Sequence, residues 1–181
     1  FATKGKGHRT IITDIAHAKE GYKEHKIPLI VDKNSKVLLL CSFPPENSHS
    51  YHQDGRNRFW EILEMLFVEK GLKGDIQAQK DFLIRRNIAL WDIFKTCKRN
   101  GPKETDIQDG EPNDLSVVFE QADIKQIFIV GKGIYKDWAC KFYPQYKDIM
   151  RPLTSSSGYT RLNVSDDEIC KEWEQIKEFL Q

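Results

Sequence analysis

The sequence predicts a three-layer α/β/α domain built on a small four-stranded parallel sheet. Short apolar runs recur along the chain, and longer stretches with helical spacing separate them. Strands separated by helices imply parallel pairing, because each crossover returns the chain to the same end of the sheet. The apolar runs that we expect to form the strands are 37–42, 88–94, 125–130 and 149–153.

Five stretches with helical spacing should cover the two faces of this sheet. Ser165 followed by Glu168 has the spacing of a capping box, and Asn113 stands where a helix cap is expected. The glycines and prolines of 98–112 indicate a long loop. The expected helices are 59–70, 77–86, 114–121, 134–142 and 166–180.

Length and composition limit the class of protein. The 181 residues, of which 39% are hydrophobic, suit one domain with a core of ordinary size. We expect residues 24–181 to form this domain, and residues 1–23 to be an N-terminal extension with a basic lead-in, a short helix and no assigned role. The formal net charge of +1 means that any face for nucleic acid must be local. It also favours a monomer.

Several functional classes lack their sequence signals. The four cysteines form no CxxC pair, so zinc and iron–sulfur sites are not indicated, and we expect reduced thiols. No Gly-x-Ser-x-Gly, HExxH or EF-hand motif occurs. We therefore expect a site without metal or cofactor. Because no apolar run approaches the roughly 20 residues that span a bilayer, and no signal peptide is visible, we expect no membrane contact. The expected location is intracellular and cytoplasmic, associated with the nucleoid if the source is bacterial.

In a doubly wound sheet, ligands bind outside the carboxyl ends of the strands. The loop 42–58 there carries more hydrogen-bonding groups than a turn requires. Asn57, taken alone, is best interpreted as a cap for the next helix, and Phe59 and Trp60 as packing residues. Asp92 interrupts an apolar run, so it needs a partner; Arg58 or a backbone amide is the expected one, with a catalytic role as the alternative.

Two later loops carry weaker signals. Gly131-Lys132-Gly133 could present backbone amides to a phosphate, but it matches neither the Walker nor the Rossmann pattern. The hydroxyl-rich stretch 154–158 suits contacts to DNA phosphates and suits an ordinary turn equally well.

Taken together and in order, three segments resemble the uracil-DNA glycosylase superfamily, most closely its hypoxanthine-DNA glycosylase branch. The resemblance spans about residues 24 to 181. The matching segments are Val37-Leu38-Leu39-Leu40-Cys41-Ser42-Phe43-Pro44 with Asn57-Arg58-Phe59-Trp60, Ile88-Ala89-Leu90-Trp91-Asp92-Ile93 with Pro112-Asn113-Asp114-Leu115, and Ile127–Val130 with Gly131-Lys132, Pro152 and Thr154-Ser155.

The resemblance implies a monofunctional DNA glycosylase of base excision repair, which flips a damaged nucleotide out of DNA and hydrolyses its N-glycosidic bond with water. It implies DNA containing a damaged base as the partner, hypoxanthine ahead of uracil or xanthine, and no cofactor. Asn57, in the Asn-Arg-Phe-Trp match, is the implied catalytic amide. We expect the other site residues to be Ser42, Phe43, Tyr51, His52 and Gly131 in the base pocket; Lys132, Arg151, Thr154, Ser155, Ser156 and Arg161 on DNA; and Asp92, Arg58 and Trp60 as structural support.

The chain departs from the branch at three places. Cys41-Ser42 stands for Gly-Ser, Asp54-Gly55 for His-Pro, and Leu153-Thr154-Ser155-Ser156 for Ser-Thr-Ser-Pro. Asp54 brings a negative charge to where DNA should lie, unless it points away. Two alternatives therefore stay open: a catalytically silent relative that binds nucleic acid or a free base, and an unrelated nucleotide-binding protein based on Gly131-Lys132-Gly133.

Overall fold

A four-stranded parallel sheet forms the centre of the molecule in a computed structural model that describes residues 22–45 and 47–181. The short helix expected within residues 1–23 lies outside these residues. The strand order is β3-β2-β6-β7, which confirms the predicted sheet. Its strands are β2 (Val37–Cys41), β3 (Ile88–Asp92), β6 (Gln126–Val130) and β7 (Met150–Leu153).

The strands form where the sequence is apolar on both faces. Leu39 pairs with Leu90 on one side and Phe128 on the other, and all three are fully buried. Near-continuous apolar runs are typical of parallel strands covered on both faces. At the carboxyl ends, Cys41 of β2 pairs with Asp92 of β3. These ends form one edge of the sheet, which we call the carboxyl rim.

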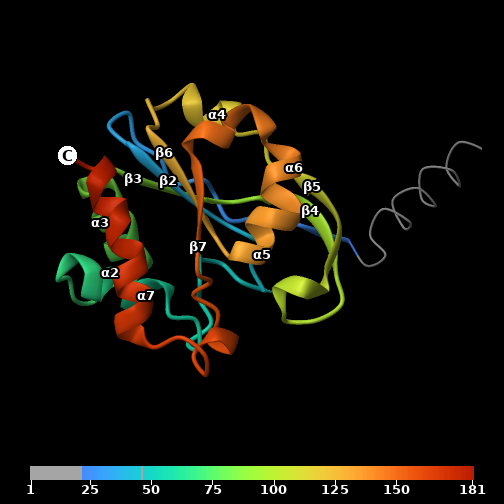
Figure 1. Ribbon diagram of the computed structural model, residues 1–181, viewed down its shortest axis with the longest axis horizontal. Helices are drawn as coiled ribbons and strands as arrows, with labels where there is room; N and C mark the ends of the chain where they lie inside the picture. The colour runs from blue at the N-terminus through green and yellow to red at the C-terminus, as the bar shows by residue number, and fades with distance from the viewer. Residues whose placement is uncertain (1–21, 46) are drawn as a thin grey trace, which may run out of the picture.

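The first face of the sheet is covered by α2 (Phe59–Phe67), α3 (Ile76–Arg85) and α7 (Asp166–Trp173), as Figure 1 shows. Val68, at φ 55°, ends α2 earlier than expected. Ser165 Oγ accepts a bond from the Glu168 N–H and the Glu168 carboxylate accepts one from the Ser165 N–H, which confirms the capping box. The end of the expected helix 166–180 is a 3₁₀ helix, Glu174–Phe179.

The second face is covered by α4 (Ser116–Phe119), α5 (Lys132–Ile134) and α6 (Cys140–Phe142) (Figure 1). A π-helical turn, Tyr135–Ala139, joins α5 to α6. Since buried clusters lie on both faces of the sheet, the three-layer α/β/α prediction is confirmed.

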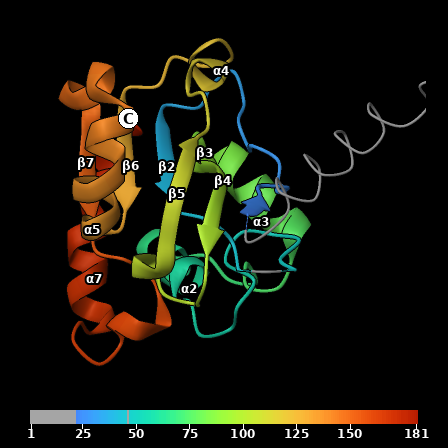
Figure 2. The same cartoon turned by 90° about the vertical axis from the view of Figure 1, so that its right-hand side faces the viewer.

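The prediction that 98–112 is a long loop is wrong. β4 (Phe94–Arg99) and β5 (Ile107–Pro112) form an antiparallel hairpin, and β1 (Tyr22–Glu24) pairs with β4 on its other edge. Register shifts between β4 and β5 break the regular alternation that would have indicated strands in the sequence. The hairpin is half-buried: Phe94 and Cys97 face the core, while the tip reaches the carboxyl rim (Figure 2).

Asn113 does not cap a helix, contrary to expectation. Its side-chain Nδ2 donates to the Asp92 carbonyl at 2.9 Å, and its backbone N–H donates to the Ile93 carbonyl at 2.7 Å. Just before α4, Asp114 Oδ1 accepts from the Ser116 N–H at 3.0 Å. Asn113 thus ties the end of the hairpin to the end of β3.

Candidate active site

A cleft of about 1620 Å³ opens at the carboxyl rim of the parallel sheet. Its walls come from the loop after β2, the segment around β1, the tip of the β4–β5 hairpin and the loop after β7. In Figure 2 the strand arrows of β2 and β6 point toward this end of the molecule. The cleft therefore lies where a doubly wound sheet binds its ligands.

Asn57 lines this cleft directly before α2. Its Oδ1 accepts a hydrogen bond from the Phe59 N–H at 2.9 Å, so the side chain does hold the start of the helix. Within residues 22–45 and 47–181, the Asn57 NH₂ group donates to no protein atom. An amide fixed through its oxygen thus keeps its two donors for a ligand.

The residues after Asn57 hold it in place from inside the protein. Arg58 is buried, and its guanidinium donates to the Val164 carbonyl at 2.8 Å and to Asp166 Oδ1 at 3.0 Å. The indole N–H of Trp60 donates to the Tyr51 carbonyl at 2.8 Å. Asn-Arg-Phe-Trp therefore connects the loop after β2 to the segment before α7, with both Arg58 and Trp60 outside the cleft.

Asp92 lines the cleft, but its expected tie to Arg58 or to a backbone amide is wrong. Asp92 Oδ2 lies 2.7 Å from Nε2 of His25, and both side chains are about 5% exposed or less. His25 follows β1 and is held by its N–H, which donates to the Lys95 carbonyl at 2.8 Å. Sequence reasoning missed His25, because no local pattern connects it with Asp92, which lies 67 residues further along the chain.

The expected pocket residues Ser42, Phe43, Tyr51 and His52 all line the cleft. His52 Nε2 lies 3.2 Å from Cys41 Sγ, and its ring stacks on Phe59 at 4.0 Å. Burial lowers the pKa of His52 to about 4, while burial and the nearby Asp92 raise the pKa of Cys41. A neutral imidazole therefore faces a protonated thiol. The cysteine that replaces the branch's glycine is used in this contact.

The loop after β7 reaches the cleft through Ser155 and Ser156. The Ser156 carbonyl accepts from the Arg58 N–H at 2.8 Å, beside Asn57. Ser155 Oγ donates to Glu104 Oε1 at 3.3 Å. Glu104 comes from the hairpin tip and also lines the cleft. It was missed because no local pattern connects it with Ser155, which lies 51 residues further along the chain.

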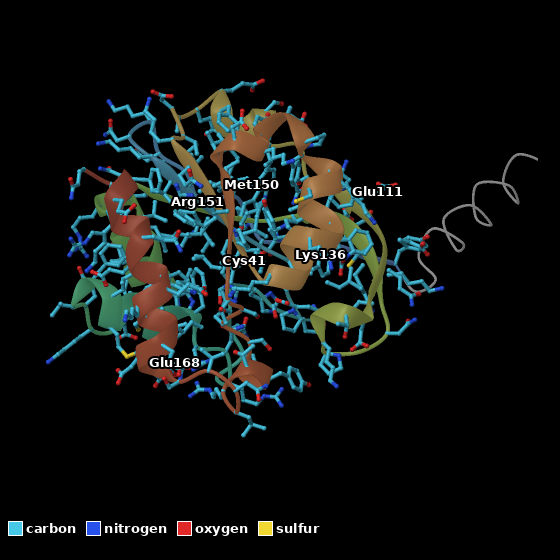
Figure 3. All side chains as sticks on the ribbon, viewed as in Figure 1. Cys41, Glu111, Lys136, Met150, Arg151 and Glu168 are labelled. Atoms are coloured by element: carbon cyan, nitrogen blue, oxygen red, sulfur yellow. The ribbon has the colours of Figure 1, made fainter. Side chains whose placement is uncertain are left out.

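Other expected site residues do not reach the cleft. Lys132 Nζ lies 3.2 Å from Glu172 of α7, and the Thr154 hydroxyl donates to the same carboxylate at 2.8 Å. Arg151 sits over the Phe179 ring at 5.2 Å, and Figure 3 shows it away from Cys41. Gly131 stands beside the cleft, which is lined by its neighbour Val130. The DNA contacts assigned to Lys132, Arg151 and Thr154 stay predictions.

Charged and apolar side chains surround the cleft's outer edge. Asp54 accepts from Arg56 at 2.9 Å, and this bond lowers the pKa of Asp54, so its charge is paired locally. Arg161 lines the cleft and lies 3.3 Å from Glu61. Leu162 lines it too and is 94% exposed, an apolar surface that the sequence did not single out.

Comparison with solved structures identifies the class of protein. The chain superimposes with a TM-score of 0.70 on a solution structure from Methanosarcina acetivorans, named provisionally as a uracil DNA glycosylase, at 27% identity; the match covers 87% of this chain and 98% of that one. The fold around the parallel sheet is therefore that of the uracil-DNA glycosylase superfamily.

Curated relatives identify the branch. The chain is 33% identical over 153 residues to a protein of Methanosarcina barkeri named hypoxanthine DNA glycosylase, covering 78% of this chain and 91% of that protein. A protein of the same name from M. acetivorans is 28% identical over 156 residues, covering 82% and 94%. No protein-family model matches. The chain belongs to the hypoxanthine DNA glycosylase family, and it is a DNA glycosylase, a hydrolase of N-glycosyl bonds.

The family assignment settles one alternative from the sequence. The alternative of an unrelated nucleotide-binding protein built on Gly131-Lys132-Gly133 is wrong, since the relatives cover most of the chain.

Among the residues that the structure describes, no helix is both long enough and apolar enough to cross a bilayer.

Proposed function

We propose that this chain removes hypoxanthine from DNA, with Asn57 as the catalytic amide in the rim cleft. The observation that supports Asn57 is its hydrogen bonding: the oxygen is held by the Phe59 N–H, and the NH₂ group lines the cleft without a protein acceptor among the described residues. The names of the curated relatives support hypoxanthine ahead of uracil or xanthine.

The reaction needs one base extruded from the duplex and one water placed beside its sugar. As the bond between C1′ and the base nitrogen breaks, the electron pair leaves with the base and the sugar gains oxocarbenium character. Asn57 orients the water that forms the new bond to C1′ and then loses a proton to solvent. The Asp92 carboxyl group, on the cleft wall, contributes to the negative potential that stabilises this cation.

The edge of the cleft offers the groups for holding DNA. Arg56 and Arg161 line it, and each is already oriented by a neighbouring carboxylate. Exposed Tyr159 and Leu162 give the same edge an apolar surface against which unstacked bases can rest. Contacts from these two guanidinium groups to DNA phosphates suit a nearly neutral protein that acts as a monomer, inside the cell and at the nucleoid in a bacterium.

A duplex with one deoxyinosine, followed by alkali treatment, tests the proposal. We expect strand scission with the wild type, and a loss of at least about 100-fold in single-turnover rate for Asn57→Asp, a size typical of losing one positioned donor. The aspartate variant retains the acceptor for the Phe59 N–H, so its fold should be intact. Asn57→Ala, which adds no charge, should bind the duplex as tightly as the wild type.

Ser157→Ala serves as a matched control on the same rim. Its hydroxyl accepts from the Tyr159 N–H at 3.3 Å, at the outer edge of the cleft, and we expect activity within about threefold of the wild type. Full activity of Asn57→Asp would remove Asn57 from the mechanism. Binding without scission by the wild type would instead support the catalytically silent relative.

A further inference from the structure

The tip of the β4–β5 hairpin places a carboxyl group in the cleft. Glu104 begins the short 3₁₀ helix Glu104–Asp106, which joins the two strands. Its side chain lines the cleft with Ser42 and Val130, which belong to the parallel sheet and its rim. Figures 1 and 2 both show the hairpin tip next to the start of α5. The antiparallel sheet thus delivers one carboxyl group to the rim of the parallel sheet.

The surroundings of Glu104 hold one of its oxygens and leave the other available. Oε1 accepts from Ser155 Oγ at 3.3 Å. Oε2 lies 3.1 Å from the point where a Cβ on Gly131 would stand, so the carboxyl group rests directly on glycine backbone. Within the residues that the structure describes, Oε2 has no hydrogen-bond partner. An oxygen in this position is free to hold a proton and donate it to a ligand.

The surroundings of Glu104 shift the pKa of its carboxyl group in opposite directions. Burial raises the pKa of Glu104, while the bond from Ser155 and the positive charge of Arg99 lower it, and burial prevails. Arg99 is itself bound to backbone carbonyls, among them that of Phe43 at 2.9 Å. Cys41, at the end of β2, carries a thiol whose pKa is raised chiefly by burial, so it adds no charge beside Glu104. Glu104 therefore stays protonated to a higher pH than an ordinary glutamate does.

We propose that Glu104 is the general acid of the reaction and donates its Oε2 proton to the departing purine. This role rests on the proposed removal of hypoxanthine. The most basic ring nitrogen of that base is N7, and protonating it makes N9 a better leaving group. The proton moves from Oε2 to N7 as the C1′–N9 bond breaks, and the electron pair stays on the neutral base. Water forms the new bond to C1′ and loses a proton to solvent, and Glu104 then takes up a proton from solvent.

Asn57 and Glu104 would then serve different halves of the reaction. Asn57 precedes α2, on the side of the cleft made by the loop after β2, and places the water. Glu104 approaches from the hairpin beside Gly131 and Ser155, at the ends of β6 and β7. A general acid of this kind contributes typically about 10²- to 10⁴-fold to a rate, with the best effect when its pKa lies near the working pH.

Single-turnover excision from a deoxyinosine duplex, measured from pH 4 to pH 9, tests this role. The wild-type rate should fall as pH rises through the pKa of Glu104. Glu104→Gln should be slower by about 100-fold or more at the acid end and lose that fall. Ser155→Ala removes a bond that stabilises the ionised form, so its rate should fall at higher pH than in the wild type. Thermal unfolding checks that each variant is folded.

Glu111→Gln is the matched control from the same hairpin. Glu111 lies on β5, where Thr96 Oγ1 donates to it at 3.4 Å, and Figure 3 shows it away from Cys41. We expect its rate and pH profile to equal those of the wild type. Glu104→Gln with wild-type rate and profile would overturn the proposal, as would a slow variant that keeps the wild-type pH profile. An unshifted profile in Ser155→Ala would also count against it, even if Glu104→Gln failed to fold. No scission by the wild type would overturn the substrate itself, and the role of Glu104 with it.

Discussion

Gly131, at the carboxyl end of β6, offers a direct test of how the rim is built. Its φ of 124° lies in a region that side chains rarely adopt, and its N–H donates to the Leu153 carbonyl at 2.8 Å, which fixes this conformation. A Cβ would stand 3.1 Å from Glu104 Oε2 and 3.3 Å from Ile134 Cγ1. Backbone strain of this type costs about 1–3 kcal/mol, and the two close contacts place the cost at the upper end.

We therefore expect Gly131→Ala to lower the free energy of unfolding by about 3 kcal/mol, a large part of the 5–15 kcal/mol typical of a domain. The melting temperature should fall by roughly 6–12 °C. Urea denaturation measures the first quantity and calorimetry the second. Gly133→Ala is the control two residues away, since a Cβ there meets nothing within 4 Å and its φ is ordinary. It should be neutral or stabilising by up to about 1 kcal/mol. Equal urea midpoints for Gly131→Ala and Gly133→Ala would refute the conformation and the contact assigned to Gly131.

Two further predictions concern the supports of the cleft. Arg58→Met should lower the free energy of unfolding by about 3 kcal/mol, because it leaves the acceptors of a buried guanidinium unpaired. Asp166→Asn should lower it by under about 1 kcal/mol, since Asp166 is 50% exposed. Urea midpoints compare them, and similar losses would contradict the structural role of Arg58. His52 has a pKa of about 4 when folded against 6.5 when unfolded, so the unfolded chain binds more protons between these values. The free energy of unfolding should decline by up to about 3 kcal/mol as pH falls from 6.5 to 4. His52→Asn should lose this part of the decline; asparagine tolerates the φ of 52° at this position. An unchanged dependence of stability on pH in that variant would count against the neutral imidazole at His52.

The parallel sheet was predictable because its strands carry their own signal. The central strand Val37–Cys41 is apolar at every position, its neighbours are mostly apolar, and polar loops bound them. Helix ends depend on finer details: Ser165 with Glu168 is a local pair that sequence reveals, whereas the left-handed turn at Val68 is not. The hairpin has no comparable signal, since its apolar residues are spaced irregularly by shifts in register.

Residues of the cleft could be predicted where topology alone brings them to the rim. Asn57 follows a strand and precedes a helix, so its placement depends on few contacts. Glu104 reaches the cleft from the antiparallel sheet, and His25 from the same sheet binds Asp92 on the cleft wall; the partners Asp92 and Ser155 lie 67 and 51 residues further along the chain. Only pairing between distant segments places them there, and a single sequence does not show that pairing.

The end of β7 shows why a rule about strand ends does not decide which residues meet a ligand. Side chains of an extended segment alternate between its two faces, so of two residues after a strand only one faces a given side. Thr154 turns toward α7, where Glu172 takes both its hydroxyl and the ammonium of Lys132. Ser155 turns the other way, toward Glu104 and the cleft. Glu172 of α7 therefore has a structural role, since it binds Thr154 and Lys132 at the ends of β7 and β6. Ser155 remains free to face the cleft, where Glu104 of the hairpin has the proposed chemical role.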